Sequence, residues 1–129
     1  MKEEKATDSK LLLDSSIWLA YLLESSHQNI IESKKTIFIS PLSIFEIKRK
    51  LCKIKIPEYE IKEKISFIKE RTITIELSNL IAEKAADISN EKDLPAIDSL
   101  IYATALINNI LIITLDNDFR SLENAEVLD

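Results

Sequence analysis

Five carboxylates lie beside short apolar runs of this chain, where an ionised acid is costly unless something compensates its charge. These acids are Asp14, Glu46, Asp98, Asp116 and Asp118. If the fold brings them together, their mutual repulsion calls for a divalent cation, because hard cations take oxygen ligands. A bound cation of this kind lets water act as a nucleophile at neutral pH. We therefore expect a metal site, with at least one raised carboxyl pKa when no metal is bound.

Four of these positions also have an ordinary structural explanation. Asp14 is followed by two serines and suits the N-cap of a helix. Asp116 and Asp118 suit an Asx turn after an apolar strand. Glu46 and Lys50 have the i, i+4 spacing of a surface ion pair on a helix. Taken singly, these acids leave both explanations open.

Asp98 has the least local compensation of the five acids. It stands in the first turn of an expected helix over 96–108, which is apolar nearly all round and therefore predicted to be buried. No Lys or Arg lies three or four residues away on either side. Only the helix dipole favours a carboxylate there. A functional role explains Asp98 better than a structural one.

The elements that must position these acids alternate between strands and helices. Strands are expected at 11–13, 36–40, 72–75 and 110–114, with a short fifth at 126–128. Helices are expected at about 16–24, 27–34, 41–56, 57–70, 78–90 and 96–108. This alternation predicts a three-layer α/β/α fold around a parallel sheet of four to five strands. Ligands of such sheets bind at the carboxyl ends of the strands, near which Asp14, Glu46 and Asp116 fall.

The helix that begins at Pro41 separates an apolar face from a charged flank. Its expected core residues are Ile44, Ile47, Leu51 and Ile54. Glu46 lies off that face with three cations placed to contact a phosphate backbone: Arg49, Lys50 and Lys53. Residues 47–71 hold nine Lys or Arg against four Glu, whereas residues 72–129 hold three against eleven acids. A solvated Lys-rich surface explains the same charges without any ligand.

Other apolar residues are expected to pack in the core. Among the aromatic residues these are Trp18, Tyr21, Phe38 and Phe45. In the helix over 78–90 they are Leu80, Ile81, Ala85 and Ile88.

The composition bounds the class of protein. The 129 residues fit one domain over 11–129, preceded by a flexible polar extension over 1–10. Glycine is absent, which excludes a Gly-rich phosphate loop and leaves left-handed turns to residues such as those at 108–109. A single histidine excludes a site with two imidazoles. A single cysteine, with no signal-peptide or membrane-spanning run, fits a cytoplasmic protein with no membrane partner.

Four segments, taken in order, resemble the PIN domain, and most closely the VapC-type toxin of toxin–antitoxin pairs. They are residues 11–16 (LLLDSS), 39–47 (ISPLSIFEI), 94–105 (LPAIDSLIYATA) and 113–119 (ITLDNDF). The third segment is the most specific, and the resemblance extends from about residue 11 to 129. Two departures are modest: the glycine that often precedes the Leu-Pro pair is missing at 91–93, and the N-terminus is a few residues longer.

This resemblance implies a Mg²⁺- or Mn²⁺-dependent endoribonuclease that acts as a toxin. It assigns the catalytic role to Asp14, Glu46, Asp98 and Asp116. It assigns metal ligation to Asp14, Asp98, Asp116 and Asp118. Ser15 and Thr114 are expected to orient carboxylates or waters. The implied partners are an RNA substrate, a small antitoxin whose tail blocks the groove, and a second copy in a homodimer.

Other readings of the acids fit less well. A haloacid-dehalogenase-like phosphatase needs a second acid two residues after the first, and Ser16 stands there. A receiver domain needs a lysine after a late strand, and none follows residues 110–114 closely. The remaining alternative is a catalytically inactive PIN-like module that binds RNA or a protein partner.

Overall fold

The computed structural model describes residues 10–129. The extension expected over 1–10 therefore lies outside the described residues, apart from Lys10, which begins the first strand. Within residues 10–129, no helix is both long and apolar enough to cross a membrane.

Five parallel strands form one sheet in the order β3-β2-β1-β4-β5, which confirms the predicted fold class. The strands are β1 (Lys10–Leu13), β2 (Thr36–Ile39), β3 (Ile73–Thr74), β4 (Leu111–Thr114) and β5 (Ala125–Val127). In the central strand β1, Leu12 is aligned with Phe38 of β2 and with Ile112 of β4. A strand that is covered on both faces has to be apolar throughout, which explains the Leu-Leu-Leu sequence of β1.

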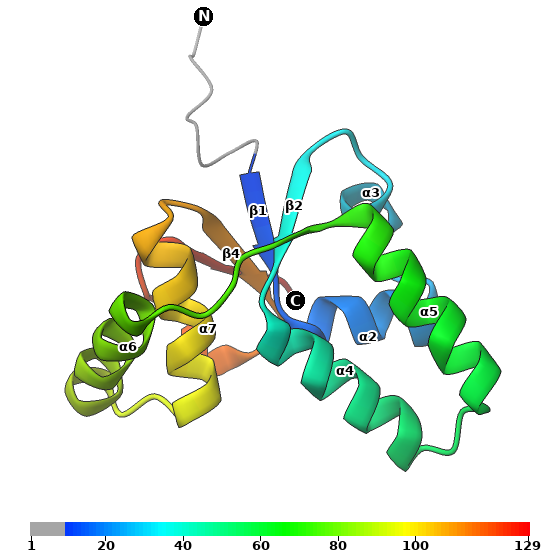
Figure 1. Ribbon diagram of the computed structural model, residues 1–129. Helices are drawn as coiled ribbons and strands as arrows, with labels where there is room; N and C mark the ends of the chain where they lie inside the picture. Colours follow the sequence, from blue (N-terminus) through cyan, green and yellow to red (C-terminus); the bar gives the residue numbers. More distant parts are fainter. Residues whose placement is uncertain (1–9) are drawn as a thin grey trace, which may run out of the picture.

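Helices cover both faces of this sheet (Figure 1). They are α2 (Ser15–Glu24), α3 (Gln28–Ile31), α4 (Pro41–Lys53), α5 (Glu58–Arg71), α6 (Asn79–Lys92) and α7 (Ala96–Ile107), followed by the 3₁₀ turn η1 (Asn117–Phe119). One core cluster joins Leu11 and Leu13 to helices α2 to α5, and the other joins Leu12 to α6 and α7. Alternate residues of β1 thus face opposite layers, as the pleat of a strand requires.

Local sequence sets where several of these elements begin and end. Ser40 accepts a hydrogen bond from the Leu42 amide at the start of α4, and Ser78 accepts one from Ile81 at the start of α6. Left-handed backbone appears at Ser25, Asp93 and Asn109, the last of them in the turn expected at 108–109. These residues take the conformation that glycine adopts most readily.

Three core predictions were wrong. Phe45, Ile54 and Leu80 are 54%, 42% and 64% exposed. Phe45 lies two residues from the buried Ile47, about 200° around the helix, so it points away from the core. Leu80 precedes the inward face of α6, which begins at Ile81, and Ile54 follows the last residue of α4. Helical periodicity predicted the buried stripe in both helices but made it too wide.

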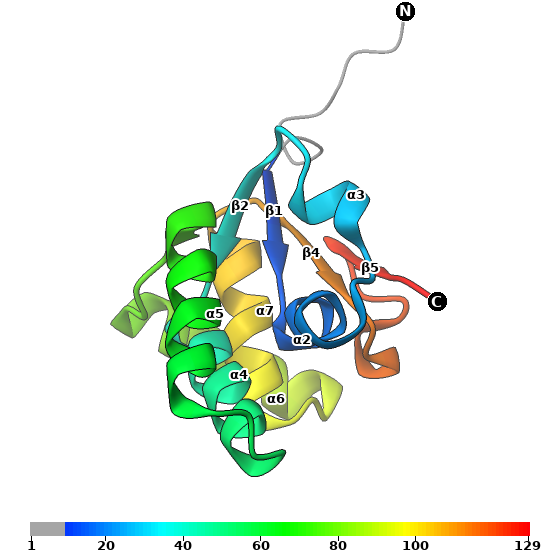
Figure 2. The same cartoon turned by 90° about the vertical axis from the view of Figure 1, so that its right-hand side faces the viewer.

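The candidate site forms where strands end and helices begin. The carboxyl ends of β1 and β2 lead directly into α2 and α4, and β4 leads into η1. Figures 1 and 2 show these strand ends at one edge of the sheet, opposite the end where β1 begins. The strand order places β1 between β2 and β4, so segments about 30 and 100 residues apart come together there.

Candidate active site

Asp14 lies at the end of the central strand and caps α2. Its Oδ1 accepts a hydrogen bond of 3.0 Å from the Ser16 amide, and its Oδ2 accepts one of 2.7 Å from Thr114 Oγ1 at the end of β4. The residue is only 6% exposed. The N-cap explanation is therefore correct for Asp14, and it does not compete with a functional one, because capping uses only part of the carboxylate.

Ser16 also binds Asp14 through its side chain, a role that the sequence analysis missed. Ser16 Oγ donates to Asp14 Oδ1 and accepts a hydrogen bond of 2.9 Å from the Leu115 amide. The sequence signal was the Asp-Ser-Ser run itself. That run predicts the amide contact of a capped helix, but it carries no information about a partner 99 residues away.

Glu46 is brought to the same edge by α4. Ser15 Oγ donates a hydrogen bond of 3.0 Å to Glu46 Oε1, which ties the second turn of α4 to the start of α2. Among residues 10–129, no ion pair joins Glu46 to Lys50, so the surface pair suggested by their spacing does not form. Ser15 thus orients a carboxylate, as does Thr114, which holds Asp14.

Asp98, Asp116 and Asp118 form the tightest group of acids. One carboxylate oxygen from each lies within 4.8 Å of the other two. Asp116 Oδ1 accepts a hydrogen bond of 2.9 Å from the Asp118 amide, which is the predicted Asx turn. Thr114 Oγ1 in turn accepts a hydrogen bond of 3.0 Å from the Asp116 amide. This turn fixes the backbone while leaving carboxylate oxygens of both acids available.

The surroundings of Asp98 disfavour the ionised form of its carboxyl. Burial raises the pKa of its carboxyl, and repulsion from Asp116, Glu46, Asp14 and Asp118 adds to this effect, bringing the value to about 6. Within the described residues, no side-chain hydrogen bond or ion pair neutralises the Asp98 carboxylate. This confirms the expectation that at least one clustered acid has a raised pKa. It also shows that the five acids share one electrostatic environment.

Two further carboxyls have raised pKa values for the same first reason, burial. The pKa of Asp14 is raised by burial and lowered in part by hydrogen bonds from Ser16 and Thr114. The pKa of Glu46 is raised by burial and by the nearby Asp14, while the Ser15 hydroxyl and Arg49 act in the opposite direction. The scaffold therefore holds together acids that repel one another, which is the condition that a bound cation relieves.

The donor set of this cluster fits Mg²⁺ or Mn²⁺. It consists of carboxylate oxygens, which these cations prefer, and the three nearest oxygens belong to Asp98, Asp116 and Asp118. The chain's one histidine and one cysteine lie elsewhere, His27 before α3 and Cys52 on the exposed surface of α4. A set without nitrogen or sulfur ligands favours a hard cation over zinc.

A hollow with basic walls adjoins Glu46. Its volume is about 270 Å³, and its lining residues are Ser15, Leu19, Glu46, Arg49, Lys50 and Lys53. The three cations of α4 that the sequence placed on one flank with Glu46 thus line one depression with it. Glu46 belongs both to this hollow and to the five acids that share one electrostatic environment, so the hollow adjoins the acids.

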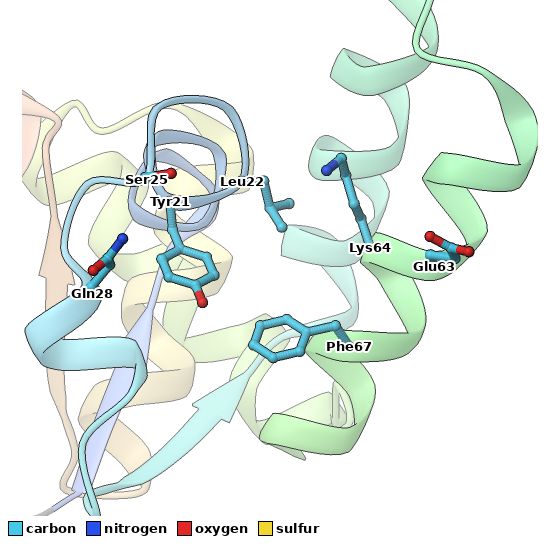
Figure 3. Close-up of a pocket in the computed structure, with 7 residues that line it drawn as sticks. All are labelled: Tyr21, Leu22, Ser25, Gln28, Glu63, Lys64 and Phe67. Carbon is cyan, nitrogen blue, oxygen red and sulfur yellow. The ribbon is translucent and has the colours of Figure 1, made fainter.

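A larger hollow lies apart from the acids, between α2, α3 and α5 (Figure 3). Its volume is about 320 Å³, and it contains none of the five acids. The Tyr21 and Phe67 rings stack beside it, with centroids 5.9 Å apart, and the Tyr21 hydroxyl donates to Glu32. The stacked rings join α5 to α2.

The sequence matches the family model of the PIN domain over residues 11–125. No curated protein matches the chain. The matched range includes all five acids and both hydroxyl residues that hold Asp14.

Solved structures share this fold at low sequence identity. A chain of a toxin–antitoxin complex from Klebsiella pneumoniae is 21% identical, with a TM-score of 0.76 over 91% of this chain and 96% of that one. A chain of VapBC2 from Rickettsia felis, bound to a promoter DNA fragment, is 19% identical, with a TM-score of 0.76 over 93% and 99%. VapC20 from Mycobacterium tuberculosis, a Sarcin-Ricin loop cleaving toxin, is 12% identical, with a TM-score of 0.67 over 88% and 95%.

Proposed function

This chain belongs to the PIN domain family, and from that premise we propose that it is a metal-dependent endoribonuclease acting as the toxin of a toxin–antitoxin pair. We also propose that residues 11–129 act as a single PIN-like domain. The observation that carries the activity is the gathering of five acids at one sheet edge, three of them with oxygens within 4.8 Å of one another. A bound cation would relieve the mutual repulsion of these acids.

The contacts of the five acids suggest two different roles among them. We assign cation binding to Asp14, Asp98, Asp116 and Asp118. Glu46 stands at the border between these acids and the basic hollow, with Oε1 held by Ser15 and Arg49 nearby. When bound, a divalent cation supplies the Lewis acid that activates water and stabilises the negative charge of phosphodiester hydrolysis. Ser15 and Thr114 keep Glu46 and Asp14 in place for that step.

The substrate is assigned to the basic hollow on charge. Arg49, Lys50 and Lys53 line it beside Glu46, and cationic side chains bind the phosphates of a nucleic acid backbone without reading its sequence. A backbone lying along α4 would place one phosphate over the acids and neighbouring phosphates on these cations. This arrangement predicts strong salt dependence of RNA binding.

The similarity to structures of toxin–antitoxin complexes supports an antitoxin partner. The similar structures from Klebsiella pneumoniae and Rickettsia felis are a toxin–antitoxin complex and VapBC2. We propose a small antitoxin whose tail blocks the groove that leads to the acids. Co-purification with a candidate antitoxin, followed by cleavage assays with and without that partner, tests this part. Full activity in the presence of a bound partner would contradict it.

We further propose a homodimer. Four large apolar side chains on α4 and between β3 and the first turn of α6 are between 41% and 64% exposed: Phe45, Ile73, Leu77 and Leu80. A second copy of the chain would cover such side chains. Sedimentation equilibrium on the wild type and on Leu80→Ser tests this, since the substitution should weaken the dimer. A wild type that is monomeric at all concentrations would contradict it.

The experiment for the activity uses purified protein freed of any partner. Single-stranded and structured RNA are incubated with Mg²⁺, Mn²⁺ or EDTA, beside Asp14→Ala, Asp98→Ala and a control, Asp87→Ala, on the exposed surface of α6. We expect cleavage that needs metal, disappears in the two site variants and persists in the control. A folded protein that binds Mn²⁺ but cleaves no RNA pool would favour the inactive binding module.

A further inference from the structure

Two hydroxyls connect the end of β4 to the two oxygens of Asp14. Ser16 Oγ accepts from the Leu115 amide (2.9 Å) and donates to Asp14 Oδ1. Thr114 Oγ1 accepts from the Asp116 amide (3.0 Å) and donates to Asp14 Oδ2 (2.7 Å). A hydroxyl has a single proton. The two hydroxyl oxygens lie 3.4 Å apart, but the shorter contact of each is to a carboxylate oxygen, which can only accept, so each hydroxyl donates its proton to Asp14.

The two carboxylate oxygens of Asp14 accept different numbers of hydrogen bonds. Oδ1 accepts from both the amide and the hydroxyl of Ser16, which uses the two acceptor positions of a carboxylate oxygen. Among residues 10–129, Oδ2 accepts a hydrogen bond of 2.7 Å from Thr114, and the Ile17 amide also lies close enough to the carboxylate to lower its pKa. The carboxylate is therefore fixed in rotation, with Oδ1 more fully committed to the scaffold than Oδ2.

We propose that Ser16 is a positioning residue that makes Asp14 bind the divalent cation through Oδ2 alone. The inference rests on the metal site of the proposed function and adds a residue to it. Ser16 does not touch the cation; it acts by holding Oδ1. Mutation of residues that orient a metal ligand in this way typically lowers metal affinity or activity by about 10- to 100-fold.

The alternative role of Ser16 is purely structural. Its amide alone is sufficient for capping by Asp14, so the hydroxyl is not needed to start α2. The hydroxyl does satisfy the Leu115 amide, and its loss should therefore lower stability whether or not Ser16 positions Asp14. Stability alone cannot separate the two roles, and metal affinity can.

The test measures Mn²⁺ affinity of the RNA-free protein by electron paramagnetic resonance of the unbound ion. The variants are Ser16→Ala, the hydroxyl-retaining Ser16→Thr and a matched control, Ser78→Ala, which removes the N-cap of α6 far along the chain from the acids. We expect Ser16→Ala to bind Mn²⁺ about tenfold more weakly. Ser16→Thr should recover most of the affinity, and Ser78→Ala should lose thermal stability without losing affinity.

Equal or tighter Mn²⁺ binding by Ser16→Ala would overturn the proposal. If that variant does not fold, the crystal structure of the Mn²⁺-loaded wild type decides: coordination through Oδ2 supports the proposal, and coordination through Oδ1 overturns it. A wild type that binds no Mn²⁺ overturns both this inference and the metal site. A wild type that binds Mn²⁺ as expected but cleaves no RNA contradicts only the proposed function.

Discussion

Asp98→Asn should stabilise the metal-free protein at pH 7 although it removes a proposed metal ligand. The Asp98 carboxylate is partly buried near four other acids and, within the described residues, has no neutralising partner. Its ionised form therefore opposes folding when no cation is bound. Asparagine keeps the shape of the side chain and removes the charge, so the repulsion disappears.

The magnitude follows from the pKa of Asp98. A pKa of about 6 in place of the ordinary 3.8 means that the ionised Asp98 carboxylate destabilises the folded protein by about 3 kcal/mol, because one pKa unit is worth about 1.4 kcal/mol. Solvent screening at this half-open site reduces that to about 1.5 kcal/mol. Loss of the favourable interaction between the charge and the N-terminus of α7 removes about 0.5 kcal/mol. A net gain of about 1 kcal/mol raises Tm by about 4 °C in a chain of this size.

The effect has a definite pH dependence. Well below pH 4, Asp98 is protonated in both the folded and the unfolded protein, and it contributes no penalty. As the pH rises from about 4 to about 6, the unfolded chain releases its proton first, so the free energy of unfolding falls. Above about pH 6 the full penalty is present. The gain from Asp98→Asn should therefore be present at pH 7 and much smaller at pH 4.

Thermal unfolding followed by circular dichroism in EDTA measures this gain. Asp87→Asn, on the exposed surface of α6, serves as the control and should change Tm little at either pH. In saturating Mn²⁺ the wild type should have a higher Tm than Asp98→Asn, because only the wild type is stabilised fully by ligand binding. An Asp98→Asn protein that is no more stable than the wild type at pH 7, or equally stabilised at pH 4, would refute the reasoning.

Three further predictions concern the basic hollow and the core. The double substitution Arg49→Gln and Lys50→Gln should weaken RNA binding and reduce by about 1.4 the slope of the log binding constant against log salt concentration. Fluorescence anisotropy across a salt series measures this slope. An unchanged slope would place the RNA elsewhere. Arg71→Ala should lower the free energy of unfolding by about 2 kcal/mol in urea titrations, because the guanidinium donates to three backbone carbonyls between α3 and β2; a loss under 0.5 kcal/mol would contradict this. Ser43→Ala should leave stability unchanged or raise it by up to about 1 kcal/mol, since the buried Ser43 Oγ has no hydrogen-bond partner within residues 10–129. A clear loss of stability would reveal a partner.

Local sequence pattern was sufficient to predict the strands. β1, β2 and β4 are short, mostly buried runs, whereas β3 is exposed and β5 is at most half-buried. The third strand was expected over 72–75 and is confined to Ile73–Thr74, and the fifth lies one residue earlier than expected. Phe45 and Leu80 were misplaced because periodicity gives the spacing of an apolar stripe but not the width that the rest of the fold covers.

Part of the candidate site could likewise be predicted from the sequence, and part could not. An acid beside an apolar run is visible in the sequence, so Asp14, Glu46 and Asp98 stand out without a structure. Their approach to one another depends on β1 lying between β2 and β4, which no local pattern specifies. The hydroxyl contact of Ser16 was missed for the same reason, since its second partner is the amide of Leu115 at the far end of the chain.

The central claim is that the gathered acids run metal-dependent RNA cleavage. Its most direct test is the ratio of RNA cleavage rates for Asp98→Ala and the wild type, measured side by side in Mn²⁺ at pH 7. We expect a loss of at least about a hundredfold in a variant that remains folded, of the order seen when one electrostatic group is removed from an active site. A folded Asp98→Ala protein that cleaves RNA within tenfold of the wild-type rate would contradict it.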